Sequence, residues 1–173
     1  MQPTITVLPG PGARVVQTGR VEAGRRTVVY TDGACHGNPG PGGWAWATSP
    51  DHYAAGAEAE TTNQRMELTA VIEAVANHPG PLEIVSDSTY VVRCFEDRWW
   101  VAWRAKGWRN VKRLPVANQD LWRPLIGEVI DHRSGEISFR WVKGHAGEPL
   151  NELVDRLATA AAHTQKPSRS SGA

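Results

Sequence analysis

The sequence predicts a single α/β domain built on a mixed β-sheet, and three observations support this class. The first half of the chain holds three short apolar segments separated by glycine and proline turns, which is typical of an antiparallel meander. A segment with apolar residues at helical spacing follows, and then an apolar strand that leads directly into another helix. A strand–helix–strand step of this kind favours a right-handed crossover, so the sheet has to be mixed.

Five strands are predicted, each of them a short apolar run that ends in turn residues. RTVVYTD, GGWAWATS and HYAAGAEA form the meander. LEIVSD is the fourth strand, and EISFRWVKG is the last. The predicted strands therefore cover 26–32, 42–49, 52–59, 82–87 and 136–144.

The segment 63–78 is predicted to be a helix, because its apolar residues recur at i, i+3, i+4 and i+7: Leu68, Val71, Ile72 and Val75. Thr61 together with Gln64, or Thr62 alone, can cap the start of this helix. The sequence PGP that follows ends it.

Four further helices are expected in the second half of the chain: from about Ser88, within 93–113, over 118–132 and over 150–162. Asn118 is the expected cap of the helix over 118–132, and Pro124 near its middle is a residue that could kink it. The order of elements is then β-β-β-α-β-α-α-α-β-α, with no internal repeat.

Length and local composition predict the domain boundaries. At 173 residues the chain is long enough for one domain that buries about 70% of its unfolded surface, and too short for two. The beginning of the chain is rich in glycine, proline and small polar residues, and the closing TQKPSRSSGA has a similar composition. We expect a flexible leader over 1–25, a folded domain over 26–162 and a flexible tail over 163–173.

The overall composition argues against several classes of protein. A net charge of +1 argues against a histone-like nucleic-acid binder. The chain has no apolar window of about 18 residues and no signal peptide, so a cytoplasmic protein with no membrane partner is expected. Its two cysteines, Cys35 and Cys94, are far apart and in no metal-type spacing, which indicates reduced thiols.

Positive charge is concentrated in the segment RCFEDRWWVAWRAKGWRNVKR, residues 93–113. Seven cations stand against two acidic residues there, and four tryptophans lie between them. Cations that meet phosphates and indole faces that pack on sugars or bases suit a nucleic-acid backbone. Taken alone, the segment fits equally well an amphipathic helix with its tryptophans in the core and its cations in solvent.

Four carboxylates are placed where one edge of the sheet could gather them. Asp32 and Asp87 each end an apolar strand, Glu67 lies in the first turns of the helix after the meander, and Asp155 lies in the final helix. Each residue by itself fits a turn, a cap or a solvated helix face. Ligands of open α/β sheets bind beyond the carboxyl ends of the strands, where these side chains could meet.

Four carboxylates at close range would repel one another and take up protons unless a cation were present. Ligation by oxygen alone selects Mg²⁺ or Mn²⁺ over zinc. Two such ions about 3.5–4 Å apart would neutralise the carboxylates and clamp the attacking and leaving oxygens of a phosphodiester. The pattern therefore predicts a nuclease site.

Four motifs in this order resemble the bacterial type of ribonuclease HI: TDGACHGNPGPGGW, TNQRMEL, SDSTYV and WVKGHAGEPLNELVDRLA. The resemblance covers about residues 28–162. It implies the ribonuclease H-like fold, an α/β architecture with a five-stranded mixed sheet of order 3-2-1-4-5 flanked by helices. It also implies endonucleolytic hydrolysis of the RNA strand of RNA–DNA hybrids, leaving 3′-hydroxyl and 5′-phosphate ends without marked sequence specificity.

The resemblance implies roles for individual residues as well. Asp32, Glu67, Asp87 and Asp155 would hold two Mg²⁺ ions in the substrate complex, with Mn²⁺ able to substitute, and His145 would exchange protons near the metals. Contacts to the hybrid are implied for residues of the glycine loop, the first helix and the basic segment: Cys35, Asn38, Thr62, Asn63, Gln64, Thr89, Trp99, Lys106, Arg109 and Lys112. The expected enzyme is a monomer without a protein partner.

The glycine loop over 33–40 is implied to lie in the minor groove of the hybrid, where backbone groups contact ribose 2′-hydroxyls. Two departures put the detail of these contacts in question, because Gln64 replaces the second Asn of the usual TNNRME and Thr89 replaces the Gln that often follows DS. A dinucleotide-binding glycine loop should open a helix, whereas GGWAWAT predicts a strand.

Two other functions fit parts of the pattern. A catalytically silent hybrid-binding module would lack one of the carboxylates, and none is missing. A resolvase or integrase core of the wider fold would lack the basic segment and the WVKGHAG strand end. The hybrid nuclease is therefore the leading hypothesis.

Overall fold

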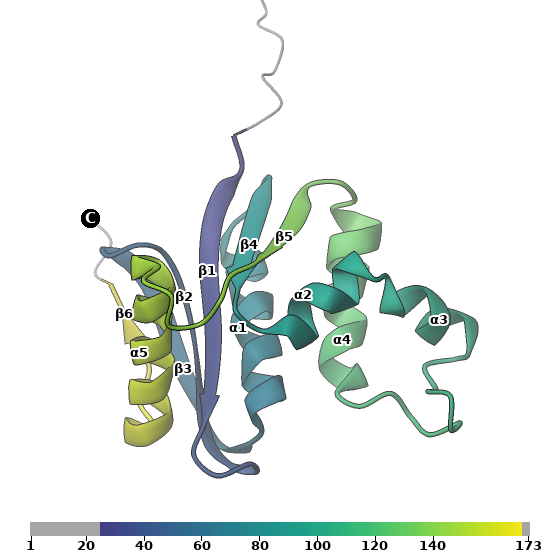
Figure 1. Ribbon diagram of the computed structural model, residues 1–173, viewed down its shortest axis with the longest axis horizontal. Helices are drawn as coiled ribbons and strands as arrows, with labels where there is room; N and C mark the ends of the chain where they lie inside the picture. Colours follow the sequence, from purple (N-terminus) through teal and green to yellow (C-terminus); the bar gives the residue numbers. More distant parts are fainter. Residues whose placement is uncertain (1–24, 171–173) are drawn as a thin grey trace, which may run out of the picture.

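The computed structural model describes residues 25–170, which form one mixed sheet with helices on both faces (Figure 1). The sheet has six strands in the order β5-β4-β1-β2-β3-β6. The predicted five-strand order 3-2-1-4-5 is confirmed within it. All but the last residue of the predicted leader, and residues 171–173 of the predicted tail, lie outside the described part of the chain.

The meander consists of β1 (Thr27–Cys35), β2 (Gly40–Ser49) and β3 (His52–Thr61), which pair antiparallel in sequence. β4 (Leu82–Ser86) pairs parallel with β1, and β5 (Ile137–Trp141) pairs parallel with β4. Thr31 lies opposite Ser86 in this register. Asp32, which is still within β1, and Asp87, which directly follows β4, therefore lie at the same level on neighbouring strands, although β1 runs on to Cys35, beyond the predicted strand end at Asp32.

Two hydrophobic cores form because successive side chains of a strand point to opposite faces of the sheet. Val29 of β1 joins the core under α1 (Asn63–Asn77), whereas Tyr30 joins the core under α5 (Pro149–Thr164). A Cβ at Gly43 of β2 would collide with the backbone of α5. The glycine lets this helix pack directly on the sheet.

The remaining helices form a side arm beyond the β5 edge (Figure 1). They are α2 (Thr89–Glu96), α3 (Trp99–Ala105), α4 (Gln119–Ile126) and the π-helical turn η1 (Gly127–His132). All four interleaved tryptophans, Trp99, Trp100, Trp103 and Trp108, are partly buried against the core under α1. Within residues 25–170, no helix combines the length and apolar character needed to cross a membrane.

The predicted helix over 118–132 is correct in extent, but its predicted cap is wrong. Asn118 adopts a left-handed backbone with φ 59°, and its side chain does not cap the helix. It instead donates to the Tyr90 hydroxyl (3.3 Å), so a tertiary contact has replaced the local one. The helix also changes to π-helical after Ile126, two residues beyond Pro124, which has no N–H for the helical ladder.

The predicted flexible tail over 163–173 is partly structured. Residues 163 and 164 continue α5, and β6 (Ser168–Arg169) pairs antiparallel with Ala54 and Ala55 of β3. Without β6, this part of β3 would present unpaired N–H and C=O groups at the edge of the sheet. A two-residue strand has no periodicity of its own, so it could not be recognised in the sequence.

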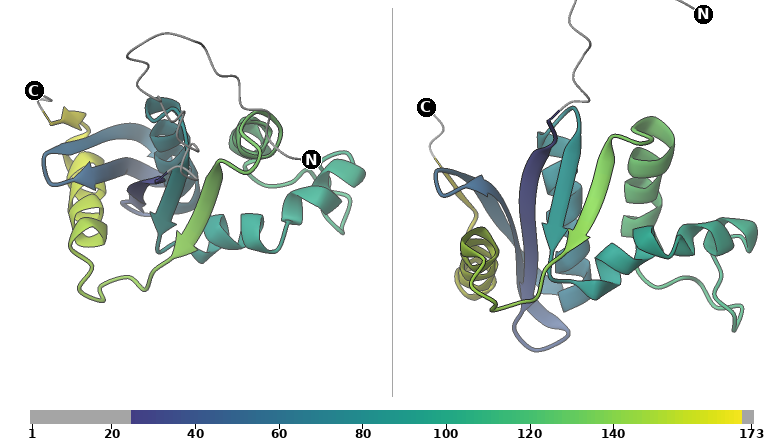
Figure 2. Two further views of the ribbon diagram at one scale, coloured as in Figure 1. Left: turned by 90° about the horizontal axis from the view of Figure 1, so that it is seen from above. Right: turned by 45° about the horizontal axis from the view of Figure 1, so that its top comes forward.

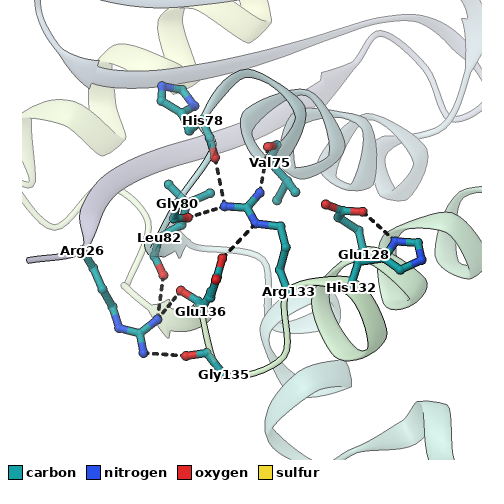
Figure 3. Close-up of polar contacts among 10 residues, drawn as sticks. All are labelled: Arg26, Val75, His78, Gly80, Leu82, Glu128, His132, Arg133, Gly135 and Glu136. Carbon is teal, nitrogen blue, oxygen red and sulfur yellow. Dashed lines mark hydrogen bonds and ion pairs between the residues drawn. The ribbon is translucent and has the colours of Figure 1, made fainter. Parts of the chain in front are cut away.

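Two arginines tie together the starts of the parallel strands, at the end opposite Asp32 and Asp87 (Figure 3). Arg26, next to β1, and Arg133, after η1, donate to backbone carbonyls near the end of α1, at the start of β4 and just before β5. The acceptors of Arg26 are Leu82, Gly135 and Glu136, and those of Arg133 are Val75, His78 and Gly80. This end of the sheet is therefore held by structural contacts.

Candidate active site

Three carboxylates meet at the carboxyl ends of the central strands. Asp32 lies on β1, Asp87 directly follows β4, and Glu67 lies in the second turn of α1. Each offers one oxygen, and these oxygens all lie within 4.8 Å of one another. The strand ends and the first helix therefore converge as their placement in the sequence suggests.

Gly33 explains why α1 comes so close to β1. A Cβ at this position would lie well under 3.0 Å from the backbone of Met66 and Glu67, so only glycine lets the helix approach. Its N–H also donates to Asp32 Oδ1 (2.8 Å). Gly33 is thus required for packing between β1 and α1. This role is separate from any contact that the following loop makes with a ligand.

Burial makes this cluster electrostatically unfavourable without a cation. Asp32 and Glu67 are only 5% and 7% exposed. Burial raises the pKa of Asp32 to about 7, with the charge of Asp87 adding to the effect and the Gly33 N–H opposing it. The pKa of Glu67 is raised well above its ordinary value, first by burial and then by the charges of Asp32 and Asp87.

These residues fit a divalent metal ion. The donor set is carboxylate oxygen only, which suits a hard cation such as Mg²⁺. Glu67 Oε2 is buried and, among the described residues, receives no hydrogen bond. A buried carboxylate oxygen in this state is stabilised either by a proton or by a cation. A divalent ion would supply the positive charge that the described residues around Glu67 Oε2 do not.

Asp155 stands apart from the other three predicted ligands. It is half-buried on α5 and is not a member of the group whose oxygens lie within 4.8 Å. Its charge nevertheless raises the pKa of Asp32, so it belongs to the same electrostatic environment.

Two residues that hold Asp87 were not identified from the sequence. Asn151 of α5 is buried, and its Nδ2 donates to Asp87 Oδ2 (3.4 Å). The indole Nε1 of Trp141, at the end of β5, donates to the Asp87 carbonyl (3.0 Å). Asn151 lies one helical turn before Asp155 on the same helix face, which was an available signal. Trp141 offered no such signal, since its bond links two segments 54 residues apart.

Several predicted substrate contacts gather where the β1–β2 loop meets the start of α1. Asn38 Oδ1 accepts from the Asn63 N–H (3.0 Å), and Thr62 caps α1 by accepting from the Arg65 N–H (3.3 Å). The Cys35 thiol donates to the Gly37 carbonyl (2.9 Å). The loop and the helix start are therefore one hydrogen-bonded unit.

The remaining predicted site residues include one beside this unit, Gln64, and two on other elements, Thr89 and His145. Gln64 is exposed and accepts from Asn118 Nδ2 at 3.5 Å, and Thr89 is exposed at the start of α2. His145 is exposed, with φ 55°, in the loop between β5 and α5.

The structure supports parts of both interpretations of the basic segment. Its tryptophans pack inward: Trp99 lies 6.1 Å from Trp103 between ring centroids, and both contact the core under α1. Its cations Lys106, Arg109 and Lys112 are exposed at the end of α3 and in the loop that follows. The segment is thus a packed arm with a cationic outer surface.

The fold and the cluster together define a class, a mixed α/β protein with a buried acidic centre of the kind that binds divalent metal ions. The family model for RNase H matches residues 24–163. The chain belongs to the ribonuclease H family.

Individual relatives agree with this assignment. A ribonuclease H of Saccharopolyspora erythraea is 48% identical over 75% of this chain and 86% of its own length. A ribonuclease HI of Caulobacter vibrioides is 42% identical over 82% of this chain and 96% of its own. A solved structure described as a type 1 RNase H with the type 2 active-site motif has a TM-score of 0.67 and 32% identity, covering 82% of this chain and 74% of that one.

Proposed function

We propose that this protein is an endonuclease that hydrolyses the RNA strand of RNA–DNA hybrids with two divalent metal ions, leaving 3′-hydroxyl and 5′-phosphate ends. The observation that carries the proposal is the buried group of Asp32, Glu67 and Asp87, whose oxygens lie within 4.8 Å of one another in a ribonuclease H chain. The hybrid is cleaved without marked sequence preference, because recognition rests on sugars and phosphates.

Asp32, Glu67 and Asp87, with Asp155 completing the set, would hold Mg²⁺, for which Mn²⁺ can substitute. When bound, such ions lower the pKa of water and neutralise the charge that develops on a phosphate. Asn151 and Trp141 position Asp87 from two different elements. His145, exposed in its loop, moves a proton to or from the reacting groups.

The surroundings of the acidic group would bind the two strands of the hybrid differently. On the RNA side, the unit of Cys35, Asn38 and Asn63 contacts sugars in the minor groove, where the 2′-hydroxyl distinguishes RNA from DNA. Gln64 and Thr89 extend this surface along α1 and α2. Thr62, together with Asn38, would bind a phosphate of the DNA strand. The DNA strand would be bound by Trp99 and by the cations Lys106, Arg109 and Lys112. The enzyme acts as a cytoplasmic monomer, with its catalytic unit over 26–162.

One assay tests this proposal. A labelled RNA–DNA hybrid, a matched RNA duplex and a matched DNA duplex are each incubated with the protein in Mg²⁺, Mn²⁺ or EDTA. We expect cleavage of the RNA strand of the hybrid alone, in either metal and not in EDTA. Cleavage of the RNA or DNA duplex at a comparable rate, or binding of the hybrid without cleavage, contradicts the proposal.

Mg²⁺ is expected to raise the melting temperature, and to raise it more at alkaline than at acidic pH. The pKa of Asp32 is about 7 in the folded state and near 3.8 in the unfolded chain. Protonation of Asp32 therefore stabilises the folded state fully below about pH 3.8, and this stabilisation is lost as the pH rises through about 7. Mg²⁺ at ten times its dissociation constant adds about 1.4 kcal/mol, or roughly 3–6 °C for a domain of this size.

Thermal melts at about pH 5.5 and about pH 8, with and without Mg²⁺ at matched ionic strength, measure this difference. The Asp87→Asn variant should show a smaller shift with Mg²⁺ than the parent. Equal shifts at the two pH values would mean that the acidic group does not bind the ion.

His145→Ala is expected to lower kcat about 10- to 100-fold, because general acid–base catalysis contributes about 10² to 10⁴ and water can partly substitute. KM and the Mg²⁺ dependence should stay close to the parent values, since the residue is outside the acidic group. Steady-state kinetics with a Mg²⁺ titration check this. Full activity would make His145 structural, and a large drop in metal affinity would make it a ligand.

A further inference from the structure

The connection from β5 to α5, residues 142–148, spans the ends of two strands. Because the sheet order is β5-β4-β1 and α5 packs on β1 and β2, this connection crosses β4 and β1, as Figure 1 and the right-hand view of Figure 2 show. Its first residue is bonded to β4, since the Val142 N–H donates to the Ser86 carbonyl (3.0 Å). His145 is exposed in the middle of the connection. The position of His145 therefore depends on how both ends are held.

The second end of the connection is held by Tyr30 of β1. The Tyr30 hydroxyl donates to Oε2 of Glu148, the residue directly before α5, at 3.0 Å. Tyr30 is only 9% exposed, and burial raises its pKa, so the hydroxyl keeps its proton and acts as the donor at neutral pH. Hydrogen bonds to a carboxylate are about twice as strong as those between neutral groups. This bond therefore ties the start of α5 to the centre of the sheet.

Two further polar side chains support Tyr30 from the neighbouring strands. Tyr30, Val85 and Arg140 lie opposite one another on β1, β4 and β5, so their side chains share the face that α5 covers. The Arg140 guanidinium, from a position close to the Tyr30 hydroxyl, opposes the effect of burial on its pKa. Arg140 Nε in turn donates to Glu83 Oε1 (2.9 Å). A chain of polar groups thus runs from β4 through β5 and β1 to the start of α5.

The Tyr30–Glu148 bond is separate from the contacts that hold the acidic group. Asp87 is held by bonds from β5 and α5 that involve neither Tyr30 nor Glu148. Gly147, which has φ 86°, directly precedes Glu148. The backbone of a glycine has more conformational freedom than that of any other residue. Loss of the bond would therefore let the connection move at Gly147 while the carboxylates keep their own contacts.

We propose that Tyr30 and Glu148 are positioning residues, whose hydrogen bond fixes the β5–α5 connection where the imidazole of His145 can exchange protons with the reacting groups. This inference rests on the proposed function and adds two residues to it. Proton transfer requires the imidazole to be within hydrogen-bond reach, so a displacement of about 1 Å is enough to slow it. Metal ions and the hybrid would be bound by other residues. The pair should therefore affect kcat, and neither KM nor the Mg²⁺ dependence.

Tyr30→Phe is the main test, because it removes the hydroxyl and keeps the ring that packs under α5. We expect kcat to fall about three- to tenfold at unchanged KM, since a positioning residue contributes no more than the group that it holds. Glu148→Ala should cause a similar loss, and Glu148→Gln a smaller one, because the amide oxygen can still accept from the hydroxyl. Tyr53→Phe on β3 is the matched control and should behave as the parent, because within residues 25–170 the hydrogen bonds of Tyr53 all use its backbone.

A double variant separates positioning from a general structural effect. Because Tyr30 acts through His145, Tyr30→Phe should cause no further loss of kcat in a His145→Ala background. A purely structural effect of Tyr30→Phe would instead lower kcat by the same factor in both backgrounds. Thermal melts of the parent, the two single variants and the double variant, measured alongside the kinetics, check that each protein is folded at the assay temperature.

Amide hydrogen exchange tests the Tyr30–Glu148 bond without any measurement of activity. In the metal-free protein, residues 143–148 should exchange faster in Tyr30→Phe than in the parent, whereas exchange in β2 and β3 should be unchanged. Three results overturn the inference: an unchanged kcat in Tyr30→Phe, an equal loss in the His145→Ala background, or unchanged exchange. A parent protein that does not cleave the hybrid contradicts the proposed function itself, and the exchange difference then still decides whether the bond holds the connection.

Discussion

Asp87→Asn is expected to abolish hydrolysis of the hybrid, by at least about 10³-fold, while leaving its affinity for the hybrid largely intact. The amide is nearly isosteric with the carboxylate and keeps an oxygen that can accept from Asn151, and the Trp141 bond goes to the unchanged backbone carbonyl. The substitution removes one of three charges directed at the metal position. Single-turnover cleavage and equilibrium binding, measured on the same labelled hybrid, separate the two effects.

The same variant has a second signature that does not depend on activity. Asp87 raises the pKa of both Asp32 and Glu67, so its neutralisation should stabilise the metal-free protein at pH 8 or so. Asp51→Asn, in the exposed turn between β2 and β3, is the matched control and should behave as the parent. Cleavage by Asp87→Asn within about tenfold of the parent would refute the metal-site assignment.

Gly33→Ala should lower both stability and activity, because its Cβ would occupy the space of the Met66 and Glu67 backbone. Overpacking of this kind costs about 3 kcal/mol, which corresponds to roughly 6–12 °C in Tm. The helix can relieve the collision only by moving away from β1, and this movement carries Glu67 away from Asp32. Thermal melts and kcat, both measured with Mg²⁺, test the two parts of the expectation.

Gly127→Ala is the matched control for this experiment. A Cβ there meets nothing within 4 Å, and the backbone is helical with φ −57°, so alanine should be neutral or stabilise by about 0.5–1 kcal/mol. If Gly33→Ala melted like Gly127→Ala and retained full activity, the close approach of α1 would not be what holds Glu67 in place.

The first half of the chain was predictable because its signals are local. Alternation and turn residues mark β1, β2 and β3, and the spacing of Leu68, Val71 and Val75 marks the face of α1 that packs on the sheet. The strand–helix–strand step predicted that the sheet is mixed. The order that makes β1 and β4 neighbours was implied by the resemblance to ribonuclease HI, and the parallel pairing of the two strands confirms it.

The unpredicted features depend on partners far away in sequence. Asn118 bonds to Tyr90, 28 positions earlier, in place of its expected capping role, and β6 is ordered through pairing with Ala54 and Ala55. Trp141 acquired its bond to Asp87 because β5 and β4 are parallel neighbours. Each feature is stabilised by a tertiary contact, and local propensity carries no information about such a partner.

The sequence by itself determined the first four strands, the first helix, the positions of the carboxylates along the chain and the chemistry of their donor set, because alternation, turn residues and residue type are properties of short segments. The strand order was predicted from the resemblance to ribonuclease HI. The tertiary structure alone decided that Asp32, Glu67 and Asp87 form the tight group, while Asp155 lies outside it and its charge raises the pKa of Asp32. It also decided that Gly33 allows the close contact with α1, and that burial raises the pKa values of Asp32 and Glu67. Distances between elements and exclusion of water arise only when the elements pack, so these properties have no signal in the sequence.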